Sequence, residues 1–148
     1  MTKVPLSLYI HLPWCVKKCP YCDFNSYRAG ENVPKKRYIS ALLRDMRQQA
    51  SRVEGREIQT IFLGGGTPSL FSSGEVCQIL DATKNYFCVA KNAEITMEEN
   101  PGTTEHDSPK GYLDAGITRL SIGAQSFSDD SLKLLGRIHS SKDISRAF

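Results

Sequence analysis

Three cysteines lie within eight residues near the start of the chain, in the arrangement Cys15-x-x-x-Cys19-x-x-Cys22. Thiolates are the protein ligands of iron–sulfur clusters, and a four-iron cubane is saturated by four of them. Three thiolates leave one iron with an exchangeable position, which can chelate the amino and carboxylate groups of a substrate or cofactor. The spacing therefore predicts a [4Fe–4S] cluster with one open iron.

Two other chemistries use cysteines at similar spacing. A structural zinc site takes four protein ligands, and the candidate for the fourth is His11, which has imperfect reach from the incoming strand. The segment Cys19-Pro20-Tyr21-Cys22 also matches a glutaredoxin-type redox motif, in which the first cysteine attacks disulfides. That interpretation leaves Cys15 unexplained. The two remaining cysteines, Cys77 and Cys88, are expected to be buried or inert side chains.

The cysteines must be positioned by the elements around them, and the hydrophobic pattern predicts those elements. Alternating or β-branched apolar runs predict strands over 6–12, 58–63, 93–98 and 117–122. Helical spacing and capping signals predict helices over about 39–55, 73–86, 109–116, 129–136 and from 140 onward. The cysteine motif falls in the first loop, 13–34. This βαβαβαβα order predicts an α/β fold with a parallel sheet and right-handed crossovers.

Composition narrows the class of protein. The chain has 148 residues and a net charge of +3, which suits one globular domain. Lysine and arginine are scattered, with the longest basic run at 35–37, so we expect a solvated face and no nucleic-acid partner. No apolar run approaches the roughly 20 residues of a membrane span, and no signal peptide is evident. Crowded cysteines without an export signal favour a reducing, cytoplasmic location.

The cysteine motif and the segments that follow closely resemble radical S-adenosylmethionine proteins of the oxygen-independent coproporphyrinogen III oxidase superfamily. Within that superfamily the chain is most similar to the HemW-type haem chaperones. The likeness covers essentially the whole chain. It is carried by the segments Tyr9–Cys15, Cys19–Asn25, Gly64–Leu70, Glu98–Gly102, Arg119–Phe127 and Leu135–His139.

The resemblance implies a fold and a set of cofactor contacts. The fold is the first half of a partial (β/α)6 barrel, with S-adenosylmethionine at the carboxyl ends of the strands, next to the cluster. Tyr21 would flank the cofactor, Gly66 and Thr67 would let backbone approach it closely, Glu98 would accept hydrogen bonds from ribose hydroxyls or an amine, and Arg137 would pair with a carboxylate. The full set of expected contact positions is Tyr9, Tyr21, Gly66, Thr67, Glu98, Gln125 and Arg137.

Without the resemblance, several of these residues have simpler explanations. A tyrosine beside a strand more often packs in a core. Glu98 could be a solvated charge at a strand end, and Arg137 a cation at a helix C-terminus. The glycine run 64–66 lacks the Gly-Lys-Ser/Thr ending of a phosphate-binding loop.

Two departures from the family pattern shape the functional prediction. Coproporphyrinogen dehydrogenases carry another cysteine two residues after the third cluster ligand, where this chain has Phe24. The resemblance therefore favours a haem chaperone that delivers haem to acceptor proteins, with a radical porphyrinogen oxidase and a thiol–disulfide oxidoreductase as alternatives. If radical chemistry operates, an electron donor is also required.

The second departure is length, since family members are substantially longer. Residues 1–148 correspond to a radical SAM core domain that lacks the remaining barrel strands and a C-terminal domain with a haem-binding motif. We expect such a chain to expose a sheet edge, and so to be poorly soluble or to depend on a partner, with a homodimer among the possible arrangements.

Overall fold

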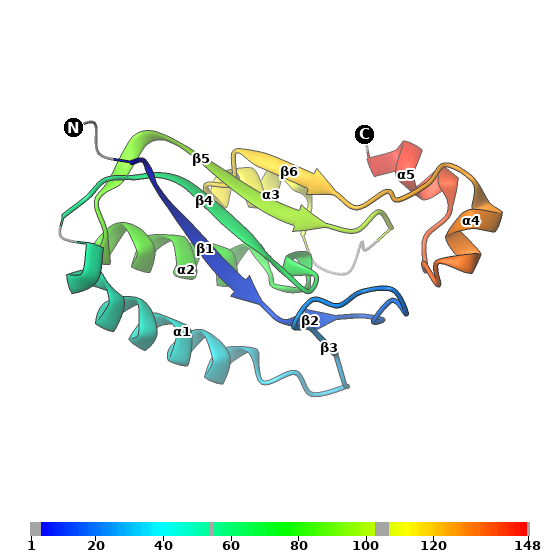
Figure 1. Ribbon diagram of the computed structural model, residues 1–148, viewed down its shortest axis with the longest axis horizontal. Coiled ribbons are helices and arrows are strands. Elements are labelled where there is room, and N and C mark those ends of the chain that lie inside the picture. Colours follow the sequence, from blue (N-terminus) through cyan, green and yellow to red (C-terminus); the bar gives the residue numbers. More distant parts are fainter. Residues whose placement is uncertain (1–3, 54, 103–106, 148) are drawn as a thin grey trace.

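The computed structural model describes residues 4–53, 55–102 and 107–147, which form one twisted sheet with helices packed against it (Figure 1). The sheet contains β1 (Leu6–Leu12), β4 (Ile58–Gly65), β5 (Val89–Glu99) and β6 (Arg119–Ile122), in the order β1-β4-β5-β6. All three pairings are parallel. Each strand therefore lies beside the next one in the chain, and the predicted α/β class with a parallel sheet is confirmed.

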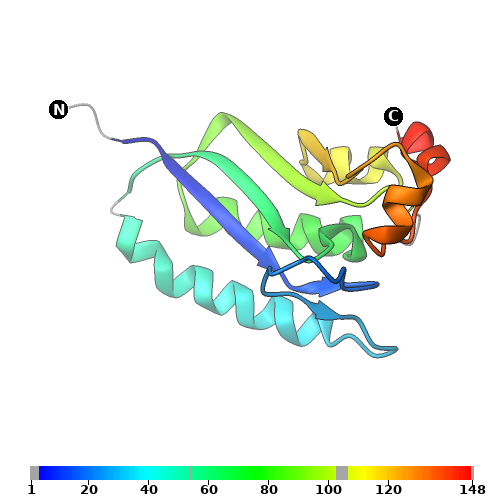
Figure 2. The same cartoon turned by 45° about the vertical axis from the view of Figure 1, so that its right-hand side comes forward.

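Helices α1 (Lys35–Gln49), α2 (Ser73–Tyr86) and α3 (Pro109–Ala115) connect the strands, and Figures 1 and 2 show α1 and α2 along the same face of the sheet. The core lies between this face and the helices. Its central members are buried aliphatic side chains from both layers: Leu12, Ile61, Leu63, Val76, Ile79 and Leu80. Burial of such side chains supplies the main stabilising free energy of the fold.

Local signals fix the helix ends as predicted. Ser72 and Glu75 form a reciprocal capping box at the start of α2. Ser108 caps α3, with Pro109 as its first residue, and Gly116 ends it in the left-handed conformation at φ 108°. In the described residues, no helix combines the length and apolar character needed to cross a bilayer.

Several boundaries differ from those expected by about two residues, and three differences are larger. Helix α1 begins at Lys35, about four residues earlier than its apolar periodicity indicated. Strand β5 begins at Val89, four residues before the expected start. The early part was missed because the polar pair Lys91 and Asn92 interrupts the apolar alternation, at the point where the pairing with β4 is irregular. The predicted loop 13–34 contains a short parallel ribbon of β2 (Trp14–Cys15) and β3 (Tyr27–Arg28).

The remaining short elements complete the chain. Two 3-10 turns, η1 (Ala50–Val53) and η2 (Pro68–Leu70), follow α1 and β4. The last two helices, α4 (Asp129–Leu134) and α5 (Ser141–Ala147), lie beyond the end of β6 (Figure 2). The carboxyl ends of the strands therefore lie between the cysteine loop on one side and α4 on the other.

Candidate functional site

A cavity of about 480 Å³ lies at the carboxyl ends of the strands, and all three motif cysteines line it. The other walls come from the turn after β4, the end of β5 and the segment after β6. Parallel α/β sheets place ligand sites at this edge because the loops there converge from successive strands. Six of the seven expected cofactor positions line this cavity: Tyr21, Gly66, Thr67, Glu98, Gln125 and Arg137.

The cysteine loop, residues 13–34, is held in shape mainly by backbone hydrogen bonds. Within the motif, Cys22 N donates to the carbonyl of Cys19 at 3.1 Å, which closes a turn between the two cysteines. In the ribbon, Ala29 N donates to the carbonyl of Cys15 at 2.7 Å. Lys18 Nζ donates to the carbonyls of Phe24 and Ser26, each at 2.9 Å, and so bridges the far side of the loop. The three cysteines are therefore presented on a cross-linked loop.

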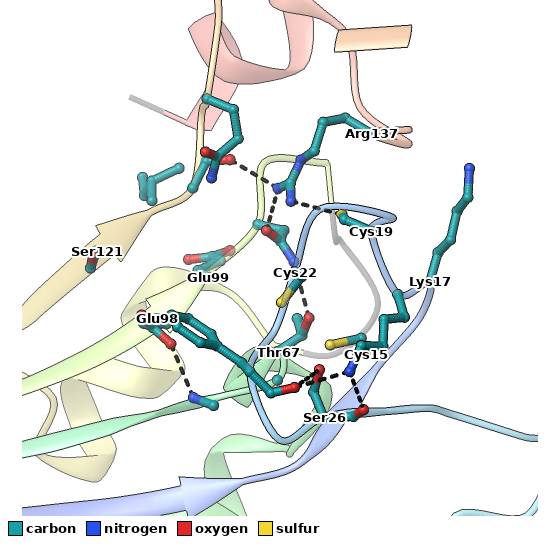
Figure 3. A pocket seen from close by; sticks show the side chains of 18 of the residues that line it. Cys15, Lys17, Cys19, Cys22, Ser26, Thr67, Glu98, Glu99, Ser121 and Arg137 are labelled. Atoms are coloured by element: carbon teal, nitrogen blue, oxygen red, sulfur yellow. Dashed lines mark hydrogen bonds between the residues drawn. The ribbon is translucent and has the colours of Figure 1, made fainter. Parts of the chain in front are cut away.

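The three motif thiols suit a cluster with several irons better than a single ion. All three are free and partly exposed. Within the described residues, no three His, Cys, Asp or Glu side chains gather where they could hold one metal ion. In a cubane each cysteine ligates its own iron, so the sulfurs do not have to meet at one point. Figure 3 shows Cys15, Cys19 and Cys22 at separate points of the loop that borders the cavity.

The glycine turn after β4 brings the cysteine loop against the sheet. Gly66 N donates to the carbonyl of Leu12 at 2.8 Å, and Thr67 N donates to that of Trp14 at 2.7 Å. A Cβ on Gly66 would lie 2.5 Å from the Trp14 carbonyl oxygen. The resemblance assigned this glycine to close approach of the cofactor. The structure adds a second reason, which is close approach of the cysteine loop's own backbone.

Glu98 and Glu99, at the end of β5, place two carboxylates at the cavity. Glu98 Oε2 accepts a hydrogen bond from Gly65 N at 3.1 Å. Gly65 itself has φ 113°, a left-handed conformation that favours glycine. Burial raises the pKa of the Glu99 carboxyl above its ordinary value, because desolvation disfavours the charged form.

Arg137 ties the opposite sides of the cavity together (Figure 3). Its Nη1 donates to Cys19 Sγ and to Tyr21 Oη, each at 3.3 Å. Its Nη2 donates to the Gly123 carbonyl at 2.9 Å and to Asn100 Oδ1. Burial raises the pKa of Tyr21, and the nearby Arg137 guanidinium partly offsets that rise. One side chain therefore links the cysteine loop with the ends of β5 and β6.

Tyr9 is the expected contact that the structure places elsewhere. It lies on the open face of the sheet, 55% exposed, and lines a neighbouring cavity of about 340 Å³ with His11 and Phe62. His11 Nε2 lies 2.7 Å from the Asn25 carbonyl, so it must donate, and Nδ1 then accepts from Tyr9 Oη at 3.0 Å. Both ring nitrogens of His11 are therefore engaged away from the cysteines, which argues against His11 as a zinc ligand.

Gln125 has a backbone conformation that few side chains adopt. Its φ is 65°, and it is the residue other than glycine with positive φ in the described part of the chain. Such a conformation costs free energy and is concentrated at functional sites. Gln125 lines the cavity directly after β6, as expected.

Asn100 is the site residue that sequence reasoning missed. Its Nδ2 donates to Thr67 Oγ1 at 3.0 Å, and its Oδ1 accepts from Arg137. It therefore joins the glycine turn to the arginine. Its position directly after β5, at the edge where parallel strands place ligand groups, was the available signal.

Comparisons with known proteins agree with this geometry. Residues 9–148 match the family described as the Radical SAM superfamily. The chain is 52% identical to "Heme chaperone HemW" of Escherichia coli (strain K12), over 97% of this chain and 38% of that protein. It is 49% identical to the protein of the same name from Haemophilus influenzae, again over 97% of this chain and 38% of the relative.

Among solved structures, the chain is similar to coproporphyrinogen III oxidase (HemN) from Escherichia coli, described as a radical SAM enzyme. The TM-score is 0.84 at 29% sequence identity, covering 95% of this chain and 32% of that one. The chain thus spans well under half the length of the relatives that it matches. Since the family match covers nearly the whole sequence, the chain belongs to the radical SAM superfamily.

Proposed function

We propose that this chain holds one [4Fe–4S] cluster through Cys15, Cys19 and Cys22, with S-adenosylmethionine at the remaining iron. The observation that carries the proposal is the gathering of the three thiols around one cavity that is also lined by Glu98 and Arg137. Thiolates are the ligands that such clusters take, and family members are defined by this cofactor pair. When bound, the pair supplies one-electron cleavage of a sulfonium C–S bond.

The side chains around the cavity would bind and orient the cofactor. The Glu98 carboxylate can accept hydrogen bonds from ribose hydroxyls or an amine, and the Arg137 guanidinium can pair with a carboxylate. Tyr21 Oη lies 3.3 Å from Arg137 Nη1, which places the ring beside the same position. Thr67 and Gln125 complete the walls. Tyr9 would act from the neighbouring cavity, which shares Glu98 with this one.

For the whole protein we propose haem delivery to acceptor proteins in the cytoplasm. The support is similarity to proteins named "Heme chaperone HemW" at 35–52% identity across most of this chain. Phe24 stands where a porphyrinogen dehydrogenase carries a further cysteine. Residues 1–148 would form part of the radical SAM core, and haem would be cargo of the full-length form.

A radical porphyrinogen oxidase is the second candidate, favoured by the likeness to HemN at a TM-score of 0.84. The two functions give different products. An oxidase incubated with a reductant yields deoxyadenosine and a decarboxylated porphyrinogen, whereas a chaperone retains haem without that turnover.

One anaerobic reconstitution tests these proposals together, with the Cys19→Ser variant as a matched protein. Iron, sulfide, haem retention and cleavage of S-adenosylmethionine are measured on the same preparations. We expect about four irons and four sulfides in the parent protein, and a large loss of both in the variant. Preferential uptake of zinc would contradict the cluster proposal. Disulfide reduction by an iron-free preparation would instead favour the thiol oxidoreductase.

A further inference from the structure

Charge is divided unequally along the chain. The first 53 residues contain ten Lys or Arg against three Asp or Glu, whereas residues 54–148 contain nine against thirteen. Most of this excess lies on α1 and η1, which contain six Lys or Arg against one Asp, whereas the cysteine loop 13–34 contains three against two. The basic residues are therefore not evenly scattered along the chain, because the excess gathers on the helix that follows the cysteine loop.

A second cavity, of about 820 Å³, lies on the outer side of the cysteine loop. Its lining joins the end of the loop to the first turn of α1, which lie side by side in Figures 1 and 2. The apolar part of the lining comes from Val16, Ala29, Val33, Pro34 and Leu70. An apolar floor of this kind suits a protein surface or an aromatic edge better than a bare anion.

The rim of the second cavity is cationic. Lys35 Nζ is already engaged, since it donates to the Leu70 carbonyl and lies 3.8 Å from Glu75. Lys36 and Arg37 are exposed, and neither forms an ion pair with any described residue. Two acidic residues, Glu31 and Glu75, also line this cavity, and Glu75 is the one beside Lys35. The two free cations therefore leave the rim with net positive charge.

The wall between the two cavities is thin. Cys15 lines the first cavity and its neighbour Val16 lines the second. Ala29, which also lines the second cavity, donates its N–H to the Cys15 carbonyl at 2.7 Å. Arg28, exposed on the same ribbon, pairs in register with Cys15. A partner seated in the second cavity is thus one peptide unit and one hydrogen bond away from a motif cysteine.

We propose that this second cavity and its cationic rim, Lys36 and Arg37, together with Arg28 on the adjoining ribbon, dock a small acidic electron-transfer protein. The inference rests on the proposed cluster at Cys15, which needs a one-electron donor. One electron leaves the reduced cofactor of the donor and enters the cluster across the β2–β3 ribbon, and no covalent bond forms or breaks. Complementary charge speeds the encounter of such partners, and transient redox complexes use small interfaces of this kind.

Nucleic acid is the rival partner for a basic surface. Phosphate-binding surfaces gather cations without carboxylates, whereas Glu31 lies on this rim and the floor beneath it is apolar. These features favour a protein with an apolar centre and an acidic surround. Competition by a single-stranded oligonucleotide is therefore included in the test.

The test compares two double charge reversals on the same helix. Lys36→Glu/Arg37→Glu changes the rim, and Arg44→Glu/Arg47→Glu makes the same change in charge roughly 12–15 Å further along α1, at 1.5 Å per residue. Cluster-loaded protein is mixed with reduced flavodoxin in a stopped-flow instrument, and cluster absorption is followed. Reduction by methyl viologen radical serves as the partner-independent control, and circular dichroism checks that each variant is folded.

We expect the rim variant to lose about tenfold or more in the bimolecular rate with flavodoxin, and the distal variant to lose about threefold or less. Reduction by methyl viologen should be similar in all three proteins. Equal slowing by both variants, or no slowing by the rim variant, would overturn the docking site. The docking site would also be overturned if the oligonucleotide bound the rim and flavodoxin did not bind the protein at all.

A second measurement separates this inference from the cluster proposal. Calorimetry with flavodoxin and cluster-free protein reports docking alone, and the rim variant should bind at least about tenfold more weakly than the distal variant. Failure to assemble a cluster would refute the proposed function while leaving this binding result intact. Equal affinities of the two variants would refute the docking site whatever the cluster content.

Discussion

The two sides of the site are attached to the sheet in different ways. The cysteine loop is held mainly by backbone hydrogen bonds, such as the one from Thr67 N to the Trp14 carbonyl and, within the loop, the one from Ala29 N to the Cys15 carbonyl. The segment after β6, residues 123–139, begins with one backbone hydrogen bond, from Gly123 N to the Glu99 carbonyl. Its later part is joined to the end of β5 and to the cysteine loop through the side chain of Arg137. Backbone attachment depends on the path of the chain, whereas side-chain attachment depends on one residue. The loop that carries the cysteines should therefore tolerate most substitutions, and the opposite wall should respond to one.

The largest effect should come from closing the space at Gly66. In Gly66→Ala the new Cβ would lie 2.5 Å from the Trp14 oxygen, and both contacting groups belong to backbone. Trp14 cannot move freely because its ring packs edge-on against Tyr38 at 4.9 Å. We expect a loss of about 2–3 kcal/mol in the free energy of unfolding, measured by urea denaturation.

The matched control for this substitution is Gly30→Ala, in the same cysteine loop. No heavy atom lies within 4 Å of a Cβ built on Gly30. Its unfolding free energy should stay within about 0.5 kcal/mol of the parent protein. Equal losses in both variants would show that the contact between the glycine turn and the cysteine loop is unimportant.

Removal of the arginine should loosen the opposite wall and spare the cysteine loop. Arg137→Gln loses donors to Asn100, Gly123 and Cys19. Charged hydrogen bonds are worth about 1.5–3 kcal/mol, so local opening of residues 123–139 should become at least tenfold more frequent. Hydrogen exchange measured by mass spectrometry reports each segment separately. An equal increase in amide exchange in residues 123–139 and in the cysteine loop 13–34 would contradict the proposed difference between the two sides of the site.

Acidification should weaken the same wall through His139. The ring is buried, and Nε2 bonds the Ala124 carbonyl at 3.1 Å. Desolvation lowers the pKa of His139 below its ordinary value of 6.5, so the folded state binds this proton less readily than the unfolded chain. The stability contributed by the neutral ring is therefore lost as pH falls below about 6.5.

Hydrogen exchange of residues 123–139 between pH 7.5 and 5.5, corrected for the intrinsic rate, measures this effect. His139→Gln should flatten the pH dependence over that interval. A variant that retains the full dependence would assign it to another group.

The smallest effect should come from the cap of α5. Asp129 Oδ1 accepts from Ser141 N at 2.7 Å, and that hydrogen bond lowers the pKa of the carboxyl. The stabilisation is present above the ordinary pKa near 3.8 and is lost as pH falls through the lowered value. Asp129→Asn should slightly raise exchange of the α5 amides at neutral pH. Asp130→Asn, at the exposed neighbouring carboxylate, should leave those amides unchanged.

The elements were predictable because their signals are local. The capping box at Ser72, the cap at Ser108 and the left-handed Gly116 each involve residues within a few positions of one another. The cysteine motif is likewise contained in eight residues. Local signals therefore predicted the parallel sheet and the cysteine motif. The other positions at its edge came from the family resemblance, and of these Tyr9 lines a neighbouring cavity.

The contacts between distant segments were not predictable in this way. Asn100 and Arg137 are 37 residues apart and meet through side chains. The β2–β3 ribbon pairs two residues with two, too few to produce an alternating pattern. Tyr9 and His11 could be assigned to one face of β1 by their spacing. Which face the helices leave open depends on packing that no single strand specifies.

Glu98 lines both the cavity of the cysteines and the cavity on the open face of the sheet. Two molecules that each change the charge or hydrogen bonding of this one carboxylate are thermodynamically linked. If a ligand in the first cavity changes the affinity of the second cavity for its own ligand by some factor, the second ligand must change the affinity for the first by the same factor. Phe24 and Gly65 also line both cavities, so ligands of the two compartments that both contact Glu98 would meet across a shared wall of three residues.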